Sequence, residues 1–379
     1  MNYRFVEENS ELDEVVAAAS EGAYAIDTEF VRERTYYPVL SLVQIAWPGG
    51  LVLIDPFKVD MKRLRPLMES DSLALVHACS QDLPILLTAT GAMPRRIFDT
   101  QVAASFLGYG VASLGALVKG ELGVELEKGS QLTDWTRRPL DERSLTYAAS
   151  DVAHLHEVHR KTTAALEKKG RLDWVREECD GLRIKAAEER DLDEAWWRLK
   201  GKSKLRGQAR GVAQALGRFR IEQAAAQDIP VKRVLSDMAI LAMAGRPPTS
   251  ERDLGRIRGM GSLSSNLAAR VLSAVAKGQA LTPEELRVPP AKPKGQQVKA
   301  AAGLCLAWVH QVAQNEGIEP GILATRDDMD ARLKKRPSRL DEGWRHALTA
   351  KGLDTLMSGE AALGVRDGQL TLMTVAADS

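Results

Sequence analysis

The chain has 379 residues, of which 44% are hydrophobic and 27% charged, and its formal net charge is +1. This composition excludes a fibrous or disordered chain and allows two or three globular domains. Its three cysteines, Cys79, Cys179 and Cys305, are too few and too far apart for a disulfide framework or a cysteine-based zinc site. The acidic N-terminus lacks the apolar segment of a secretion signal, and no run reaches the roughly 18 apolar residues of a membrane span. We therefore expect a cytoplasmic protein that makes no use of a membrane.

The first 170 residues alternate strand and helix patterns. Short apolar runs predict strands over 24–26, 41–46, 51–54 and 73–77, with a WPGG turn between the second and the third. Helical patterns cover approximately 11–20, 60–69, 82–90, 99–106, 111–120 and 141–168. Neighbouring strands followed by alternating strands and helices predict an α/β domain over residues 1–172, in which helices flank a mixed sheet.

The remainder of the chain shows almost no strand pattern and predicts two small all-α domains. We expect a helical linker over 173–203, a first helical domain over 204–282, a linker over 283–298 that contains RVPPAKPKGQQ, and a second helical domain over 299–375. The two helical blocks have similar lengths but only weak similarity.

Charge is distributed unevenly between these regions. Residues 1–170 contain 18 Lys and Arg against 24 Asp and Glu, whereas residues 200–290 contain 16 against 7. The basic block indicates contact with a polyanion, most simply nucleic acid, and a solvated basic helical face is the alternative. The acidic excess indicates either an acidic surface or carboxylates gathered around a metal.

Acidic side chains follow two of the predicted strands. Asp27 and Glu29 lie in AIDTEF, at the end of an apolar strand. Because side chains two residues apart share one face of a strand, both carboxylates can project from the same sheet edge. Asp82 follows the strand LALVH at the start of a helix. Taken singly, these residues would most often be a solvated strand end and a helix cap.

A helical segment supplies two further groups. Tyr147 and Asp151 are four residues apart in LTYAASDVAHL and so share one helix face. Four carboxylates that cluster need a counter-charge, since otherwise one of them must be protonated. Hard divalent cations such as Mg²⁺ prefer oxygen ligands, and a pair of them can promote phosphodiester cleavage. Tyr147 would then orient the attacking water or help to deprotonate it.

These residues lie within a longer resemblance. Residues 24–170 resemble the tyrosine-containing branch of the DEDD superfamily of 3′–5′ exonucleases, and within it the ribonuclease D family. The resemblance covers most of residues 20–165, in the family's order and nearly without gaps. It rests on AIDTEF, TYYPVLSLVQIAW, LIDPF, HACSQDLPIL, IFDTQVAASFLGYG, SLGALVKGELGVELEKGSQLTDWTRRPL and YAASDVAHL.

The resemblance implies a ribonuclease-H-like fold and assigns roles to the five residues. By this likeness Asp27, Glu29 and Asp151 would hold the metal on the side of the nucleophile, and Asp27 would bridge to a second metal that Asp82 supports. Both ions would be Mg²⁺ or Mn²⁺. Tyr147 would position the hydrolytic water.

Other residues within the resemblance are candidates for substrate contact. Phe30 could stack on the terminal nucleotide, with a core aromatic as an equal alternative, while His77 and Gln81 more often serve at strand ends and helix caps. Asp99 is expected to cap the helix over 99–106. Arg137 and Arg138 could meet phosphate, although solvated arginines are the favoured interpretation.

The basic block resembles a second family. Residues 208–278 are similar to the helicase-and-RNase-D C-terminal (HRDC) domain, an all-helical nucleic-acid-binding module, through DIPVKRVLSD and RPPTSERDLGRIRGM. The resemblance places four cations near loops or helix starts, where they could contact phosphates: Lys232, Arg233, Arg256 and Arg258. Ribonuclease D proteins carry two such domains, so residues 299–375 are expected to be a degenerate, mainly structural HRDC-like copy.

Together these observations predict a metal-dependent 3′–5′ exoribonuclease that releases nucleoside 5′-monophosphates. The expected partner is RNA with a single-stranded 3′ end, in particular tRNA precursors, and a monomer is the default state. One alternative is a 3′–5′ exonuclease that acts on DNA, because the same site can cut either backbone. The other is an inactive RNA-binding scaffold, which the complete set of four acids and Tyr147 disfavours.

Overall fold

The computed structural model describes residues 2–126, 133–260, 264–289 and 296–375. The chain forms two compact units: residues 1–29, 40–187 and 292–379 make unit 1, and residues 30–39 and 188–291 make unit 2. No helix among the described residues is sufficiently long and apolar to cross a membrane.

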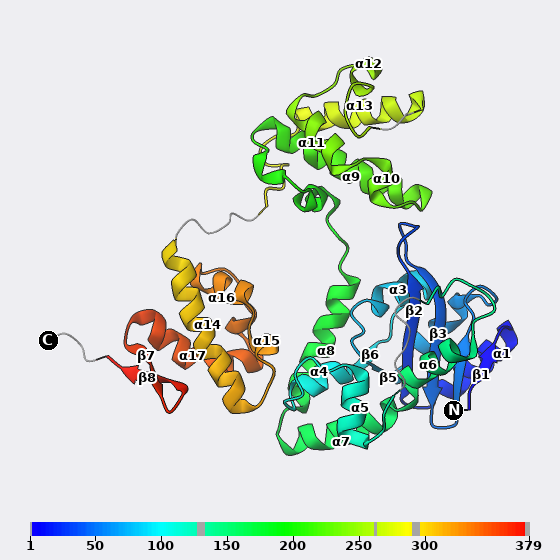
Figure 1. The fold of residues 1–379 in the computed structure, drawn as a ribbon, viewed down its shortest axis with the longest axis vertical. Coiled ribbons are helices and arrows are strands. Elements are labelled where there is room, and N and C mark those ends of the chain that lie inside the picture. The colour runs from blue at the N-terminus through cyan, green and yellow to red at the C-terminus, as the bar shows by residue number, and fades with distance from the viewer. Residues whose placement is uncertain (1, 127–132, 261–263, 290–295, 376–379) are drawn as a thin grey trace. The chain divides into compact units, whose positions relative to one another are not determined.

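Unit 1 is built around a mixed six-stranded sheet (Figure 1) with the order β1-β4-β3-β2-β5-β6. The strands β1 and β4, β2 and β5, and β5 and β6 pair in parallel, whereas β3 and β4 form an antiparallel hairpin. The strands span Arg4–Val6 (β1), Tyr24–Val31 (β2), Val39–Trp47 (β3), Gly50–Ile54 (β4), Leu73–Val76 (β5) and Arg96–Asp99 (β6).

Helices with well-defined ends accompany this sheet. Side chains of Asp60, Asp99, Ser113 and Asp141 cap the starts of η1, α4, α5 and α6 by accepting backbone N–H bonds. The helices span Asn9–Ala19 (α1), Met61–Leu64 (η1), Arg65–Met68 (α2), Asp82–Thr90 (α3), Thr100–Ser105 (α4), Leu114–Leu122 (α5), Glu142–Ala153 (α6), Leu155–Lys168 (α7) and Leu172–Ala187 (α8).

This architecture confirms the predicted mixed sheet with flanking helices. The predicted strands do not include β1 and β6, because runs of three and four residues are too short to show a period. The first predicted strand also ends too early. β2 continues through the polar residues to Val31, so Asp27 and Glu29 lie inside the strand and not at its end. The domain boundaries at 172, 203, 282 and 298 stay predictions.

The C-terminal part of unit 1 is mostly helical and ends in a hairpin. Its elements are α14 (Gln296–Glu316), α15 (Pro320–Leu323), α16 (Arg326–Leu333), η4 (Arg339–Asp341), α17 (Gly343–Ser358), β7 (Ala361–Arg366) and β8 (Gln369–Thr374). The expectation of an all-α block is wrong for β7 and β8. Asp367 and Gly368 both have positive φ, 52° and 78°, which is the geometry that an Asp-Gly dipeptide favours in a two-residue hairpin turn.

This C-terminal part packs against α8 within unit 1. Trp344 stacks on Trp174 with ring centroids 5.1 Å apart, and Arg345 donates to both carboxylate oxygens of Glu178, at 2.5 and 2.7 Å. Arg171 is similarly paired with Glu316 at 2.8 Å. The buried apolar residues of the sheet and of the C-terminal helices accordingly form one continuous core.

Unit 2 contains a helical bundle with its own core. Its helices are η2 (Leu192–Arg198), η3 (Lys202–Lys204), α9 (Gln208–Gln227), α10 (Val231–Val234), α11 (Asp237–Gly245), α12 (Glu251–Leu254) and α13 (Ser265–Ala280). Trp196, fully buried, belongs to this core. The helices α9 and α13 approach so closely that a Cβ on Gly211 would lie 2.3 Å from the carbonyl oxygen of Gly278, which explains glycine at both positions.

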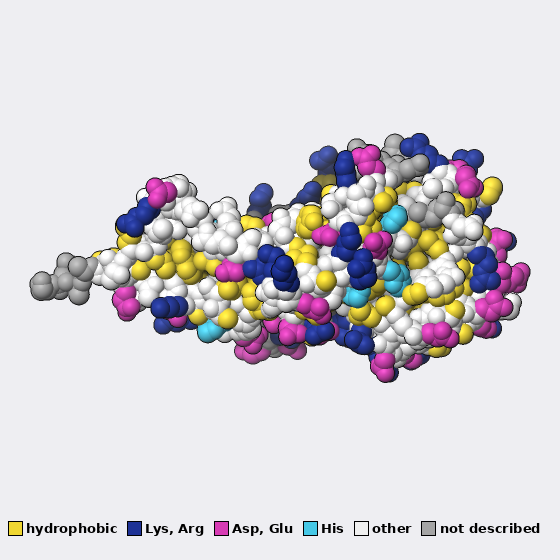
Figure 2. Space-filling model, turned by 90° about the horizontal axis from the view of Figure 1, so that it is seen from below, with side chains coloured by type: hydrophobic (Ala, Val, Ile, Leu, Met, Phe, Trp, Pro, Cys, Tyr) yellow, Lys and Arg dark blue, Asp and Glu magenta, His cyan; other side chains and the backbone are white. Residues whose placement is uncertain are grey.

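Charged side chains of both signs are interspersed on the face drawn in Figure 2. Among the described residues visible there, neither Lys and Arg nor Asp and Glu take over the whole face. This face therefore shows no broad surface of one charge.

Candidate active site

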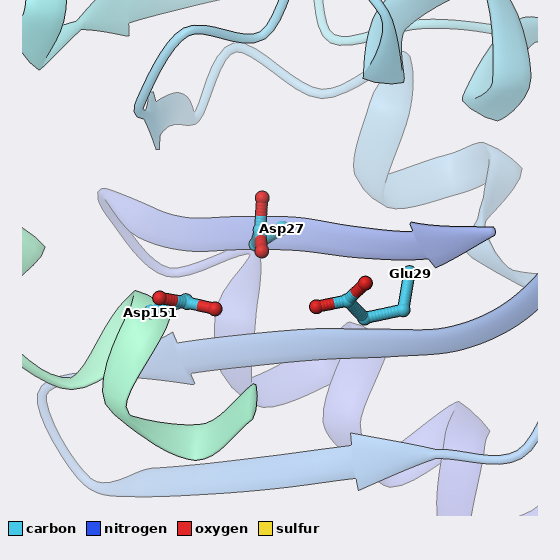
Figure 3. A group of neighbouring side chains, drawn as sticks. All are labelled: Asp27, Glu29 and Asp151. Carbon is cyan, nitrogen blue, oxygen red and sulfur yellow. The ribbon is translucent and has the colours of Figure 1, made fainter. Parts of the chain in front are cut away.

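Three carboxylates converge between β2 and α6. Asp27 and Glu29 project from the same face of β2, and Asp151 lies near the end of α6 (Figure 3). One oxygen from each of the three lies within 4.8 Å of the others. The predicted alternation along a strand and the predicted helix face thus bring together side chains that are more than 120 residues apart in the sequence.

Tyr147 lies one helical turn before Asp151 on α6. Its hydroxyl and the Asp151 carboxylate are hydrogen-bonded. The pKa of Tyr147 is raised, first by burial and then by the negative charges of Asp151, Glu29 and Asp27. Without a bound cation the phenol is therefore neutral at physiological pH.

Asp82 lies beside this group but not in it. It is the first residue of α3, and its carboxylate accepts a hydrogen bond from the Thr28 hydroxyl. Its charge still reaches the cluster, because it contributes to raising the pKa values of Asp27 and Glu29. The structure thus places the fourth predicted acid next to the three that converge.

The clustered carboxylates hold protons unusually strongly. Burial, followed by repulsion from Asp151 and Asp82, raises the pKa of Glu29 to about 8. Burial raises the pKa of Asp151 to about 7, against the effect of the hydrogen bond from Tyr147. For Asp27 burial comes first, followed by the charges of Asp82, Asp151 and Glu29, and its pKa lies well above the ordinary value. Such a set of hard oxygen donors fits divalent cations, which would offset the repulsion.

A cavity of about 310 Å³ opens onto the carboxylates. Of the substrate candidates Phe30, His77 and Gln81, only His77 is among the described residues that line the cavity. Sequence reasoning missed four other lining residues, which come from segments with no marked chemical pattern: Gln101, Ser113, Leu114 and Leu155. They belong to quoted motif segments or follow Asp151 closely, but nothing in their residue types distinguishes them from scaffold.

Asp99 shapes the loop that carries His77. Its carboxylate accepts the backbone N–H groups of Ala78 and Cys79, both at 3.0 Å, and that of Gln101 at 2.8 Å. Ala78 is held at a φ of 59°, a left-handed conformation that is costly for alanine without such support. The predicted helix cap is confirmed, and the same carboxylate also fixes the chain between β5 and α3.

Phe30 and Gln81 do not line this cavity among the described residues. Phe30 follows Glu29 on β2, so its side chain points to the opposite face of the strand, and Arg32 lies over its ring at 4.8 Å. Gln81 is exposed at the residue before α3.

Arg138 has a structural role that the sequence did not reveal. It binds both oxygens of Asp55, at 2.6 and 2.8 Å, and donates to the Ser41 carbonyl at 2.6 Å. Asp55 is completely buried. The favoured interpretation of Arg138 as a solvated side chain is therefore wrong, because the partner that binds it lies 83 residues away. Its neighbour Arg137 is exposed, as expected.

The four cations singled out in unit 2 are exposed. Lys232 and Arg233 lie in α10, and Arg256 and Arg258 follow α12. Within the part of the chain that the structure describes, none of the four forms a salt bridge, whereas Arg220 is buried and paired with Asp237 at 2.7 Å. They are therefore available to an anionic partner.

Comparisons with known proteins agree with this geometry. Residues 3–167 match a family described as 3′–5′ exonuclease, and residues 209–266 match the HRDC domain family. Relatives named ribonuclease D include one from Sphingobium indicum, 33% identical over 360 residues and 92% of each chain. Another, from Nitrobacter hamburgensis, is 34% identical over 92% of this chain and 90% of its own.

One solved structure is similar over nearly its whole length. It is that of Escherichia coli RNase D, described as an exoribonuclease involved in structured RNA processing. It matches with a TM-score of 0.82 and 29% identity, covering 95% of this chain and 99% of its own. The likeness therefore extends over the sheet and the helical parts together.

Proposed function

This chain belongs to the ribonuclease D family of 3′–5′ exoribonucleases, and we propose that it trims RNA at the cluster formed by Asp27, Glu29, Asp82, Tyr147 and Asp151. The observation that carries this proposal is the convergence of three carboxylates within 4.8 Å of one another. A protein without a cation to bind would gain nothing from such repulsion.

Two divalent cations, Mg²⁺ or Mn²⁺, fit this donor set. Asp27, Glu29 and Asp151 would hold one, and Asp27 would share the other with Asp82. When bound, the cations supply charge stabilisation to the reacting phosphate and to the attacking and leaving oxygens.

The side chains of the protein then position the reaction. Tyr147, kept neutral and hydrogen-bonded to Asp151, orients the attacking water toward phosphorus. Water adds to the terminal phosphodiester, the bond from phosphorus to the 3′ oxygen breaks, and the proton lost by water balances the one gained by that oxygen. The products are a nucleoside 5′-monophosphate and RNA with a new 3′ hydroxyl.

The size of the cavity favours a single-stranded end. A volume of about 310 Å³ lies at the low end of small-ligand pockets, so it suits one nucleotide and not the end of a duplex. We propose tRNA precursors as the substrates, with the four exposed cations of unit 2 contacting phosphates elsewhere on the RNA. We also propose that the protein acts as a monomer, which light scattering would test.

A ladder assay tests this function. Matched RNA and DNA oligonucleotides with single-stranded 3′ tails and a 5′ label are incubated with Mg²⁺ or with EDTA. We expect Mg²⁺-dependent shortening of the RNA, with release of 5′-monophosphates. Equal or faster loss of the DNA would indicate a DNA exonuclease, and retained RNA binding without any shortening would indicate an inactive scaffold.

A further inference from the structure

A second, larger hollow adjoins the carboxylate cavity. It has a volume of about 660 Å³ and is lined mainly by the segment from Thr133 to Ser144. Tyr147 lines both this hollow and the cavity that holds Asp27, Glu29 and Asp151. The two hollows therefore meet at Tyr147, where a strand with its end in the cavity would pass from one to the other.

Two exposed arginines line this hollow. Arg137 and Arg143 form no salt bridge within the described part of the chain. Arg143, Tyr147 and Asp151 follow one another at intervals of four residues, so they form a stripe along one face of α6. At 1.5 Å per residue, Arg143 begins about 12 Å along the helix axis from Asp151. A cation, a phenol and a metal-binding carboxylate thus follow in order along one helix.

The backbone that carries Arg137 is held at two points. Trp135 is buried, and its ring lies 6.4 Å from that of Tyr147, centroid to centroid. Arg138 is held by Asp55, as described above, and its charge is thereby neutralised. Between these anchors Arg137 remains free of a charged partner among the described residues, so a phosphate can bind it without first breaking an ion pair.

The acidic residues of the hollow already have partners. Asp141 caps α6 through the backbone and hydroxyl of Ser144, at 2.8 and 3.0 Å. Asp134 accepts the backbone N–H and the hydroxyl of Thr136, at 3.1 and 2.5 Å. Both carboxylates keep their negative charge, but these neutral groups occupy their oxygens, and neither forms a salt bridge with Arg137 or Arg143 among the described residues. The two guanidinium groups therefore remain available as donors to a phosphate.

We propose that Arg137 and Arg143 bind the phosphates of the RNA strand immediately upstream of the scissile bond. This inference rests on the proposed function, since it takes the carboxylate cavity as the position of the 3′-terminal nucleotide. A phosphodiester strand is repelled by four carboxylates, and two cations at the entrance offset that repulsion. Arginine can also bind a phosphate through two parallel hydrogen bonds. The hollow contacts the strand without reading its sequence.

The test compares substrate lengths. The double variant Arg137→Ala/Arg143→Ala is assayed on a single-stranded RNA 12-mer and on a dinucleotide without a 5′ phosphate, whose only phosphate is the scissile one. For the 12-mer we expect KM to rise at least tenfold with kcat within twofold of the parent. For the dinucleotide both constants stay within twofold. Arg176→Ala, which removes an exposed arginine of α8 outside the hollow, leaves both substrates unaffected.

Salt dependence provides a second measurement. Each phosphate contact on a single strand contributes about 0.7 to the slope of log affinity against log salt, so losing two contacts lowers its magnitude by about 1.4. Arg137→Lys/Arg143→Lys keeps both charges and should restore most of that slope. An unchanged KM for the 12-mer, or an equal loss on the dinucleotide, would overturn the proposal.

A measurement of RNA binding distinguishes a failure of this inference from a failure of the proposed function. Fluorescence anisotropy of the labelled 12-mer in EDTA does not need catalysis. If the parent cuts nothing but the double variant still binds more weakly with a shallower salt slope, the proposed function fails and the arginine hollow stands. If the parent cuts RNA and the double variant binds like the parent, the hollow fails alone.

Discussion

Tyr147 and Asp151 lie one turn apart on α6, and the phenol donates a hydrogen bond to the carboxylate. This contact links the residue that we propose to orient water with one of the groups that would hold a cation. The two proposed roles, orienting water and holding a cation, can be tested separately by substitution.

Replacing Tyr147 with Phe removes the hydroxyl and keeps the ring next to Trp135. We expect kcat on RNA to fall about 10²-fold or more, the usual effect of losing a positioned proton-transfer or orienting group. Mn²⁺ affinity, measured by titration calorimetry, should change less than threefold. An equal loss in Mn²⁺ affinity would show that the hydroxyl serves the carboxylates and not the water.

Asp27→Asn keeps the volume of the side chain and removes the negative charge of Asp27 from the carboxylate cluster. Cleavage in the ladder assay should be abolished while RNA affinity stays within threefold of the parent. Asp71→Asn, at a side chain that is 93% exposed, is the matched control and should cut normally. Activity of Asp27→Asn within tenfold of the parent would contradict the metal assignment.

The raised pKa values predict how pH and metal act together. Without a cation, Glu29 has a pKa of about 8 in the folded chain and 4.5 as its ordinary value. The folded state then binds a proton more tightly than the unfolded chain does, so stability in EDTA should fall as pH rises from about 5 to 8. Mg²⁺ binding requires release of these protons. The increase in Tm caused by Mg²⁺ should therefore be larger at pH 8.5 than at pH 5.5.

Glu29→Gln provides the matched variant for that measurement. It removes the repulsion, so in EDTA at pH 8.5 its Tm should exceed that of the parent, and Mg²⁺ should raise it less. A Tm increase by Mg²⁺ that is independent of pH would contradict the account.

The adjacent arginines Arg138 and Arg137 form a natural pair for stability measurements. Arg138→Ala leaves the buried charge of Asp55 without its partner, which typically costs about 3–5 kcal/mol. Arg137→Ala changes an exposed side chain and should stay within about 0.5 kcal/mol of the parent. Urea unfolding of both variants measures the difference, and equal values would show that the Asp55 contact contributes little.

The contribution of unit 2 to RNA binding can be tested without deleting the unit. Replacing Lys232, Arg233, Arg256 and Arg258 with Ala should weaken binding of structured RNA and reduce its salt slope, because exposed cations contact phosphates. Cleavage of a dinucleotide should be unaffected. Equal binding of structured RNA by the variant and the parent would assign these cations to solvent.

The acids could be predicted from sequence because simple periods carry them. The spacing of Asp27 and Glu29 on a strand, and of Tyr147 and Asp151 on a helix, already fixes which side chains share a face. Asp82 was predicted at a helix start, but its contact with Thr28 depends on how α3 packs beside β2, which no local pattern shows.

The missed features have two physical causes. The pairing of Arg138 with Asp55 joins residues 83 positions apart, and such long-range contacts leave no local signal. The hairpin of β7 and β8 did leave one, the Asp-Gly dipeptide at 367–368, but the helical patterns around it dominated the interpretation.

The most direct test of the central claim is anomalous diffraction from crystals that contain Mn²⁺ and a short RNA. The account predicts peaks within coordination distance of Asp27, Glu29 and Asp151, with one shared by Asp27 and Asp82, and their loss in Asp27→Asn. An RNA that is trimmed normally while no peak appears at these carboxylates would contradict it.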